Sequence, residues 1–212
     1  MFDFQPSQSI KIFFNIHLVL SKKHKISTLR LVSAMAKPDK ASPKVTLRMF
    51  DPSDADDFMA WAGDARVSRF TREDVFTSRE DALHHIHDTV LPHPWYRAIC
   101  IDNDDRRAVG SIWVDPGQGA VDGCRGSISY RLAHDYWGRG IATSALKAAV
   151  KVVFAEWAHL ERVEAIVRVE NFGSQRVLEK AGFVREGVLR RYVAHKGKAE
   201  DMVMYSILSS EV

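Results

Sequence analysis

The sequence predicts an α/β fold of the α+β type, in which a mixed, twisted sheet of about seven strands carries about four helices on its two faces. Two observations lead to this prediction. Short segments with strand-like alternation are interspersed with segments that have helical periodicity. The elements of the second half also follow the order β-α-β-α-β-β, which indicates a mixed sheet rather than a bundle or a sandwich.

Each expected element is supported by a local signal. The expected strands cover residues 45–50, 95–101, 108–114, 126–132, 163–169, 183–194 and 202–208. The expected helices begin near residue 51 and cover residues 78–90, 141–159 and 172–180. Residues 51–54 combine acids with a proline at a helix start, and residues 78–81 nearly match a capping box. Residues 102–105 join two β-like segments and predict a hairpin.

Residues 1–44 are expected to form a basic N-terminal extension, either disordered or used for targeting, ahead of one domain at residues 45–212. The extension has eight lysine and arginine residues against two acids, whereas the remainder is mildly acidic. Its apolar run at residues 10–20 is too short to span a bilayer. Lysines follow this run, which argues against a secretory signal. An organelle transit peptide and translation from Met35 remain alternatives.

The composition excludes several classes of function. The mildly acidic domain argues against nucleic acid as a partner. Cys100 and Cys124 provide neither a disulfide framework nor the spacing of a metal site. We therefore expect a cytoplasmic protein without a metal or a membrane segment, unless residues 1–34 direct the chain to a plastid or mitochondrion. A monomer and a homodimer both remain open.

The turn at residues 136–143 is the most informative motif. Gly138 and Gly140 lie between a strand and the apolar helix that begins near Ile141. A glycine turn at a helix start leaves several backbone N–H groups pointing at one place, where the helix dipole also favours an anion. The turn therefore predicts a phosphate-bearing ligand. The dinucleotide fingerprint G-x-G-x-x-G is not met, because Thr143 stands at the third glycine position.

Two segments together resemble the GNAT superfamily of acetyl-CoA-dependent N-acetyltransferases, and within it the RimJ/RimL-like branch of ribosomal-protein N-terminal acetyltransferases. They are the turn Trp137-Gly138-Arg139-Gly140-Ile141-Ala142 and the segment from Asn171-Phe172-Gly173-Ser174 to Gly182-Phe183. The resemblance covers about residues 45–208. It implies a mostly antiparallel sheet with a V-shaped splay between the central strands.

The resemblance also implies the co-substrate, acetyl-CoA, and the residues that hold it. The pyrophosphate would lie on the glycine turn, and the pantetheine arm would run along the strand at residues 130–132 like an added strand. The implied cofactor-binding residues are Tyr130, Arg131, Leu132, Trp137, Gly138, Arg139, Gly140, Ile141, Ala142, Thr143, Asn171 and Ser174.

The implied reaction is direct attack of a neutral amine on the acetyl thioester, and three positions are candidates for catalysis. A backbone N–H near Leu132 would stabilise the oxyanion, and Ser174 would meet the departing thiol. Ser127 stands where many relatives carry a glutamate base, and Leu178 stands where many carry a tyrosine acid. The base is therefore open between a water chain held by Ser127 and another acid. The candidate acids are Glu73, Asp74 and Glu170.

The acceptor is expected to be a primary amine. The branch favours a protein N-terminal α-amine, with a small amine (polyamine, arylalkylamine or amino acid) as the alternative. A non-catalytic acyl-CoA-binding regulatory module is a further alternative, because Ser127 replaces the usual base. The expected acceptor-binding residues are Trp61, Phe70, Trp95 and Tyr96, although aromatic residues at such places are more often part of the core.

Overall fold

The computed structural model describes residues 43–212, apart from residues 72–74, 102–106, 118–121 and 196. The expected extension up to residue 42 and the expected hairpin turn at residues 102–105 lie outside the described residues. The strands are β1 (Val45–Arg48), β2 (Tyr96–Ile101), β3 (Gly110–Pro116), β4 (Arg125–Leu132), β5 (Arg162–Arg168), β6 (Val184–His195) and β7 (Lys198–Leu208). The helices are α1 (Ala55–Ala62), α2 (Ala65–Ser68), α3 (Arg79–His85), α5 (Ile141–Glu156) and α6 (Phe172–Ala181).

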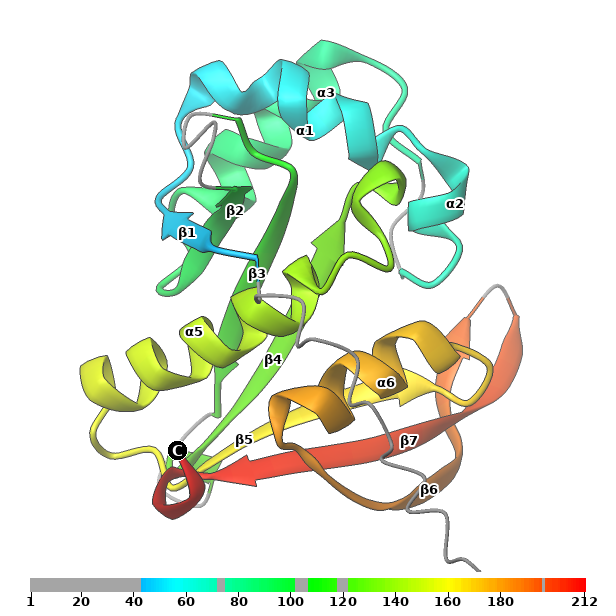
Figure 1. Ribbon diagram of the computed structural model, residues 1–212. Coiled ribbons are helices and arrows are strands. Elements are labelled where there is room, and N and C mark those ends of the chain that lie inside the picture. The colour runs from blue at the N-terminus through cyan, green and yellow to red at the C-terminus, as the bar shows by residue number, and fades with distance from the viewer. Residues whose placement is uncertain (1–42, 72–74, 102–106, 118–121, 196) are drawn as a thin grey trace, which may run out of the picture. The chain divides into compact units, whose positions relative to one another are not determined.

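The strands form one 7-stranded sheet in the order β1-β2-β3-β4-β5-β7-β6 (Figure 1). All neighbouring pairs are antiparallel except β4 and β5, which run parallel because α5 connects them. This arrangement confirms the mixed, mostly antiparallel sheet that the sequence predicted. The antiparallel pair of β2 and β3 is the expected hairpin.

Helices cover both faces of the sheet, as expected from the sequence. The alternation along β2 shows the two faces, since Ile99 belongs to one apolar cluster whereas Ala98 and Cys100 belong to another. The first cluster joins the sheet to α5 and α6, and the second joins it to α1 and α3. The face covered by α5 and α6 is called the helix α5 face below, and the opposite face is called the helix α1 face.

Most helix starts follow from their capping residues. The Asp51 side chain accepts a hydrogen bond from the Ser53 N–H at the start of a 3-10 turn (Pro52–Asp54) that leads into α1. The Ser78 hydroxyl accepts from the Asp81 N–H at the start of α3, which continues as a π-helical turn (Ile86–Val90). These side chains satisfy N–H groups that a helix start leaves without intrahelical partners.

Two local features differ from the sequence prediction. The short helix α2 was not expected, and it begins where the Asp64 side chain accepts from the Arg66 N–H. Helix α5 ends at Glu156 and not at residue 159, because Trp157 leaves the helical conformation. Among the described residues, no helix is long and apolar enough to cross a membrane.

The central strands β4 and β5 separate after a short paired stretch. Their register runs only from Arg125 opposite Arg162 to Ser127 opposite Glu164, although β4 continues to Leu132 and β5 to Arg168. Each strand keeps its other neighbour, β3 or β7, along its length. The two halves of the sheet therefore diverge, which confirms the predicted V-shaped splay.

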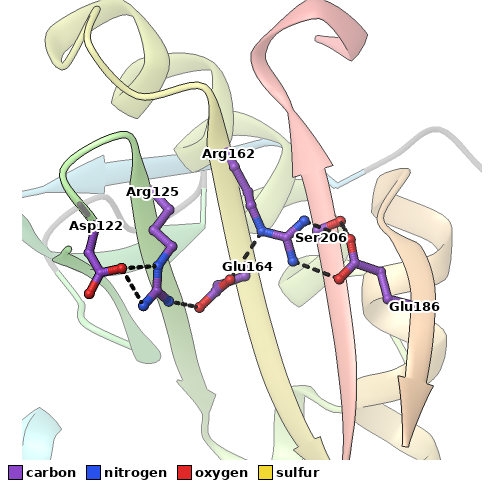
Figure 2. Close-up of polar contacts among 6 residues, drawn as sticks. All are labelled: Asp122, Arg125, Arg162, Glu164, Glu186 and Ser206. Carbon is purple, nitrogen blue, oxygen red and sulfur yellow. Dashed lines mark hydrogen bonds and ion pairs between the residues drawn. The ribbon is translucent and has the colours of Figure 1, made fainter.

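A chain of ion pairs crosses four strands at the closed end of this splay (Figure 2). Arg125 contacts Glu164 at 2.6 Å, and the second Glu164 oxygen lies 3.1 Å from Arg162. Arg162 also binds Glu186 at 2.6 Å, and the Ser206 hydroxyl donates to the same carboxylate at 2.6 Å. These contacts hold β4, β5, β6 and β7 together where the two central strands still pair.

Candidate active site

A cleft of about 790 Å³ opens between the diverging parts of β4 and β5. Its lining includes residues 127–132 of β4 and residues 165–168 of β5 without a gap, so side chains from both faces of the sheet contribute. Because neighbouring side chains of a strand point to opposite faces, the cleft passes through the sheet. One mouth lies beside α5 and α6, and the other lies on the helix α1 face.

The glycine turn lies at the mouth beside α5. Gly138 has φ 70° and Gly140 has φ 82°, so both occupy the left-handed region that side chains disfavour. Gly140 is the N-cap of α5, whose first turn contains no acidic residue. The first N–H groups of this 16-residue helix have no intrahelical partners. The turn therefore has the donors and the dipole that a pyrophosphate requires.

The structure brings most of the sequence-predicted cofactor residues to the cleft. Those that line it are Tyr130, Arg131, Leu132, Trp137, Gly138, Gly140, Ile141, Ala142, Thr143, Asn171 and Ser174. Arg139 is not part of the lining, because its guanidinium lies over the Tyr136 ring at 5.4 Å from the centroid. These residues fit the phosphates and arm of coenzyme A, and their individual roles stay predictions.

The carbonyl of Leu132 is already engaged by a side chain. The Trp137 indole N–H donates to it at 2.7 Å, and Trp137 remains 43% exposed. A carbonyl oxygen has two lone pairs, so this contact takes one of the two acceptor positions that Leu132 could offer to an arm along β4. The contact also fixes the glycine turn to the end of β4, since Trp137 immediately precedes Gly138.

Asn171 and Ser174 both serve the start of α6. The Asn171 side-chain oxygen accepts from the Ser174 N–H at 3.1 Å, which is an N-cap bond. The Tyr130 hydroxyl reaches across the cleft from β4 and donates to the Ser174 carbonyl at 3.1 Å. Burial raises the pKa of the Tyr130 phenol, so it acts as a neutral donor. Asn171 therefore caps α6, and its binding to the cofactor stays a prediction.

Three of the four expected acceptor-binding aromatic residues belong to the core. Trp61, Trp95 and Tyr96 are 1%, 0% and 4% exposed and do not line the cleft. The Trp61 indole N–H donates to the buried Ala108 carbonyl, and the Trp95 indole N–H donates to the carboxylate of Glu156 at the end of α5. These three assignments are therefore corrected.

Phe70 and a further aromatic residue, Trp113, do line the cleft. Trp113 stacks on Tyr96 with ring centroids 5.0 Å apart, and the Arg131 guanidinium lies 5.1 Å from the Trp113 centroid. Sequence reasoning missed Trp113, because alternation along a short strand does not say which of the two faces borders a cleft.

Two of the four positions considered for the base line the cleft. Ser127 and Glu170 line the cleft, whereas Glu73 and Asp74 lie outside the described residues. Asp115 of β3 also lines the cleft, 56% exposed at its side chain, and it was not singled out from the sequence. Among the residues that the structure describes, no cluster of histidine, cysteine and acidic side chains could hold a metal ion.

Comparison with known proteins identifies the family. A family model described as an acetyltransferase (GNAT) domain matches residues 44–184. The chain therefore belongs to the GNAT family of acetyltransferases, and it is an acetyl-CoA-dependent acyltransferase. The family and the enzyme class that the sequence predicted are confirmed.

Relatives along most of the chain support this assignment. The chain is 29% identical to the uncharacterized N-acetyltransferase p20 of Bacillus licheniformis over 174 residues, which cover 79% of this chain and 94% of p20. A GNAT-family acetyltransferase from Bacillus anthracis has TM-score 0.71 and 26% identity, and covers 80% of this chain and 98% of its own. Mycobacterium smegmatis RimJ in complex with CoA-disulfide has TM-score 0.65 and 26% identity, with 81% and 85% coverage.

Proposed function

We propose that the protein acetylates the α-amine of a protein or peptide N-terminus by direct attack on acetyl-CoA. The observation that carries this proposal is the charge of the cleft. Among its described residues, the carboxylates are Asp115 and Glu170, whereas the cationic side chains are Arg131, Arg168, Arg176 and Lys180. Arg176 and Lys180 belong to α6 at the coenzyme mouth, and Arg168 is paired with Glu200 at 2.9 Å. The described lining of the helix α1 face therefore offers a multiply charged polyamine no cluster of carboxylates. A peptide presents a single amine with a neutral backbone behind it.

The co-substrate fits the other mouth of the cleft. The glycine turn and the start of α5 would bind the pyrophosphate, and the arm would run along β4 toward Ser127, where the strands close. RimJ of Mycobacterium smegmatis, crystallised in complex with CoA-disulfide, supports this assignment. Ser174 would lie near the sulfur, and a backbone N–H of β4 between Ser127 and Leu132 would meet the oxyanion.

Direct attack is favoured over a covalent acetyl-enzyme. The described cleft lining contains no cysteine, since Cys100 is buried in the second apolar cluster and Cys124 lies elsewhere on the surface. Pre-positioning of the amine and the thioester can itself supply several kcal/mol of rate acceleration. The passage through the sheet would allow both reactants to be held at once.

The proposal is tested by an acceptor screen on the full chain, with release of free thiol from acetyl-CoA as the readout. The panel contains peptides with a free N-terminus, the same peptides with a blocked N-terminus and an internal lysine, spermidine and an arylalkylamine. We expect kcat/KM for the best free peptide to exceed that for spermidine by at least about tenfold, a difference of about 1.4 kcal/mol. Blocked peptides should be inactive.

Two outcomes would overturn this assignment. Higher kcat/KM for the arylalkylamine than for every peptide would make the aromatic pair Phe70 and Trp113 the acceptor pocket of a small-molecule enzyme. Tight binding of coenzyme A without turnover of any amine would favour a regulatory acyl-CoA-binding module.

A further inference from the structure

The position of Ser127 leaves the reaction without an obvious proton acceptor on β4, and the neighbouring strands each place one carboxylate beside it. Ser127 pairs with Asp115 of β3 on one side and with Glu164 of β5 on the other. Paired residues of neighbouring strands project from the same face of a sheet. All three side chains therefore point to the helix α1 face, where the acceptor mouth of the cleft lies.

Glu164 is not available for proton transfer. Its side chain is 9% exposed, and each carboxylate oxygen contacts a guanidinium group. Arg125 lies 2.6 Å from Oε1, and Arg162 lies 3.1 Å from Oε2 (Figure 2). It is also absent from the cleft lining. The contacts indicate a structural carboxylate that holds the closed end of the splay.

Asp115 has the opposite surroundings. Its side chain is 56% exposed and lines the cleft, and its ion-pair partner is a histidine and not an arginine. The His93 Nε2 atom lies 3.0 Å from the carboxylate. On β4, Arg125 is diagonal to Asp115, and it is engaged by Asp122 and Glu164.

The protonation of His93 follows from its second contact. The Trp95 backbone N–H donates to Nδ1 at 3.1 Å, so this nitrogen has a lone pair and carries no proton. In the neutral imidazole, the proton is then on Nε2, which donates to Asp115. The ring is only 15% exposed and packs against Tyr96 at 5.6 Å between ring centroids. His93 therefore holds Oδ1 of Asp115 in place, and the second carboxylate oxygen is not part of this hydrogen bond.

Glu170 is a weaker candidate because of its place along the cleft. It follows the end of β5, beyond Arg168, whereas Asp115 lies level with the closed end. Arg168 lies four positions beyond Glu164 along β5, which is about 13 Å of strand. An arm that starts from phosphates at the open end brings its thioester toward the closed end, and thus toward Asp115.

We propose that Asp115, held by His93, is the general base of this acetyltransferase and replaces the carboxylate that β4 lacks at Ser127. Asp115 takes one proton from the acceptor ammonium, directly or through a water molecule on Ser127. The nitrogen lone pair then attacks the thioester carbonyl carbon. A C–N bond forms, the C–S bond breaks, and sulfur leaves with the electron pair of that bond. The second nitrogen proton passes to the sulfur, and Asp115 releases its proton to solvent.

The inference rests on acetyl transfer to an amine but not on which amine is used, so it can be tested with any acceptor that the wild-type protein acetylates. Asp115→Asn should lower kcat/KM at pH 7 by about 10²-fold or more, the usual contribution of a general base. The loss should shrink as pH rises, because the amine then deprotonates without help. The affinity for coenzyme A should be unchanged in calorimetry.

The matched control is Asp88→Asn. Asp88 also contacts a histidine, His87 at 2.7 Å, but this pair is 70–80% exposed and belongs to the π-helical turn. The Asp88→Asn variant should retain wild-type kcat/KM at every pH. Equal activities of Asp115→Asn and Asp88→Asn at pH 7 would overturn the proposal.

A second variant moves the carboxylate across the strand pair. Asp115→Asn combined with Ser127→Glu should recover at least about tenfold of the lost kcat/KM, because the new carboxylate projects from the same face. His93 is tested as a positioning residue in the same assays. His93→Gln keeps an N–H donor and should keep the pH profile, whereas His93→Leu should lower kcat with little change in KM. No recovery in the double variant, with coenzyme A binding intact, would count against a base at this place.

Discussion

At the scale of single residues, Gly138 shows how backbone conformation is required for ligand binding. Its φ of 70° disfavours any side chain, yet a Cβ built there has no heavy atom within 4 Å. The need for glycine is therefore conformational and not steric. Gly197, in the turn between β6 and β7, has φ 77° and the same open surroundings. The two glycines form a matched pair, one in the predicted phosphate site and one far along the chain from it.

Replacement of either glycine should have the same effect on stability but a different effect on binding. Gly138→Ala and Gly197→Ala should each lower the free energy of unfolding by about 1–2 kcal/mol, the cost of a left-handed alanine. Only Gly138→Ala should also weaken coenzyme A binding, by at least about tenfold in calorimetry. Equal affinities of the two variants would mean that the turn does not bind the phosphates.

The residue scale is also where sequence analysis reached its limit. Gly138 and Gly140 were identifiable because glycine before a helix has a specific backbone meaning. Asp115 and Trp113 were not, because their significance depends on the face of the sheet and on a neighbour, His93, that is separated by 22 residues from Asp115. The acceptor-site prediction for Trp61 and Trp95 was wrong for the same reason. Aromatic residue type suits a binding pocket, but the contacts of these two side chains are those of core residues.

At the scale of elements, the sequence predicted nearly every strand and helix, because periodicity and capping residues are local signals. It missed α2, since a helix of four residues has no periodicity to detect. The splay was expected from family resemblance and not from the strands themselves. The residues of β4 and β5 read as ordinary strands, and only their register shows where pairing stops.

The ion pairs that close the splay make stability depend on pH. Arg162, followed by Ser206, lowers the pKa of Glu186 to about 2 from its ordinary 4.5. A carboxyl group whose pKa is lower in the folded than in the unfolded chain stabilises the fold at any pH above the unfolded-state pKa. This stabilisation is lost as pH falls from about 4.5 toward 2. Glu186 is 40% exposed, so the contribution is expected to be small, on the order of 0.5–1 kcal/mol.

Glu186→Gln should therefore lower Tm by about 1–4 °C near pH 7, and the difference from wild type should vanish toward pH 2. Glu161→Gln removes one exposed carboxylate immediately before β5 and is the control for a general change in charge. Scanning calorimetry across this pH range measures both. A Tm difference for Glu186→Gln that persists unchanged at pH 2 would contradict the assigned pKa.

At the scale of the whole molecule, the cleft through the sheet has a kinetic consequence. Its described lining contains no cysteine that could carry an acetyl group, and its two mouths lie on opposite faces. Acetyl-CoA and the amine should therefore be bound together before reaction. Initial rates measured against both substrates should give intersecting double-reciprocal lines. Parallel lines would indicate a covalent acetyl-enzyme and contradict direct attack.

The two mouths of the cleft share β4 but otherwise draw on separate stretches of chain. The donor side consists of β4, the glycine turn and the starts of α5 and α6, whereas the acceptor side takes Val67 and Phe70 from the first half and Val193 and Met202 from the last hairpin. Mutation can thus reshape one side while the other is inherited intact. Proteins that descend from such a scaffold can therefore change their amine acceptor during evolution and keep the same acetyl donor.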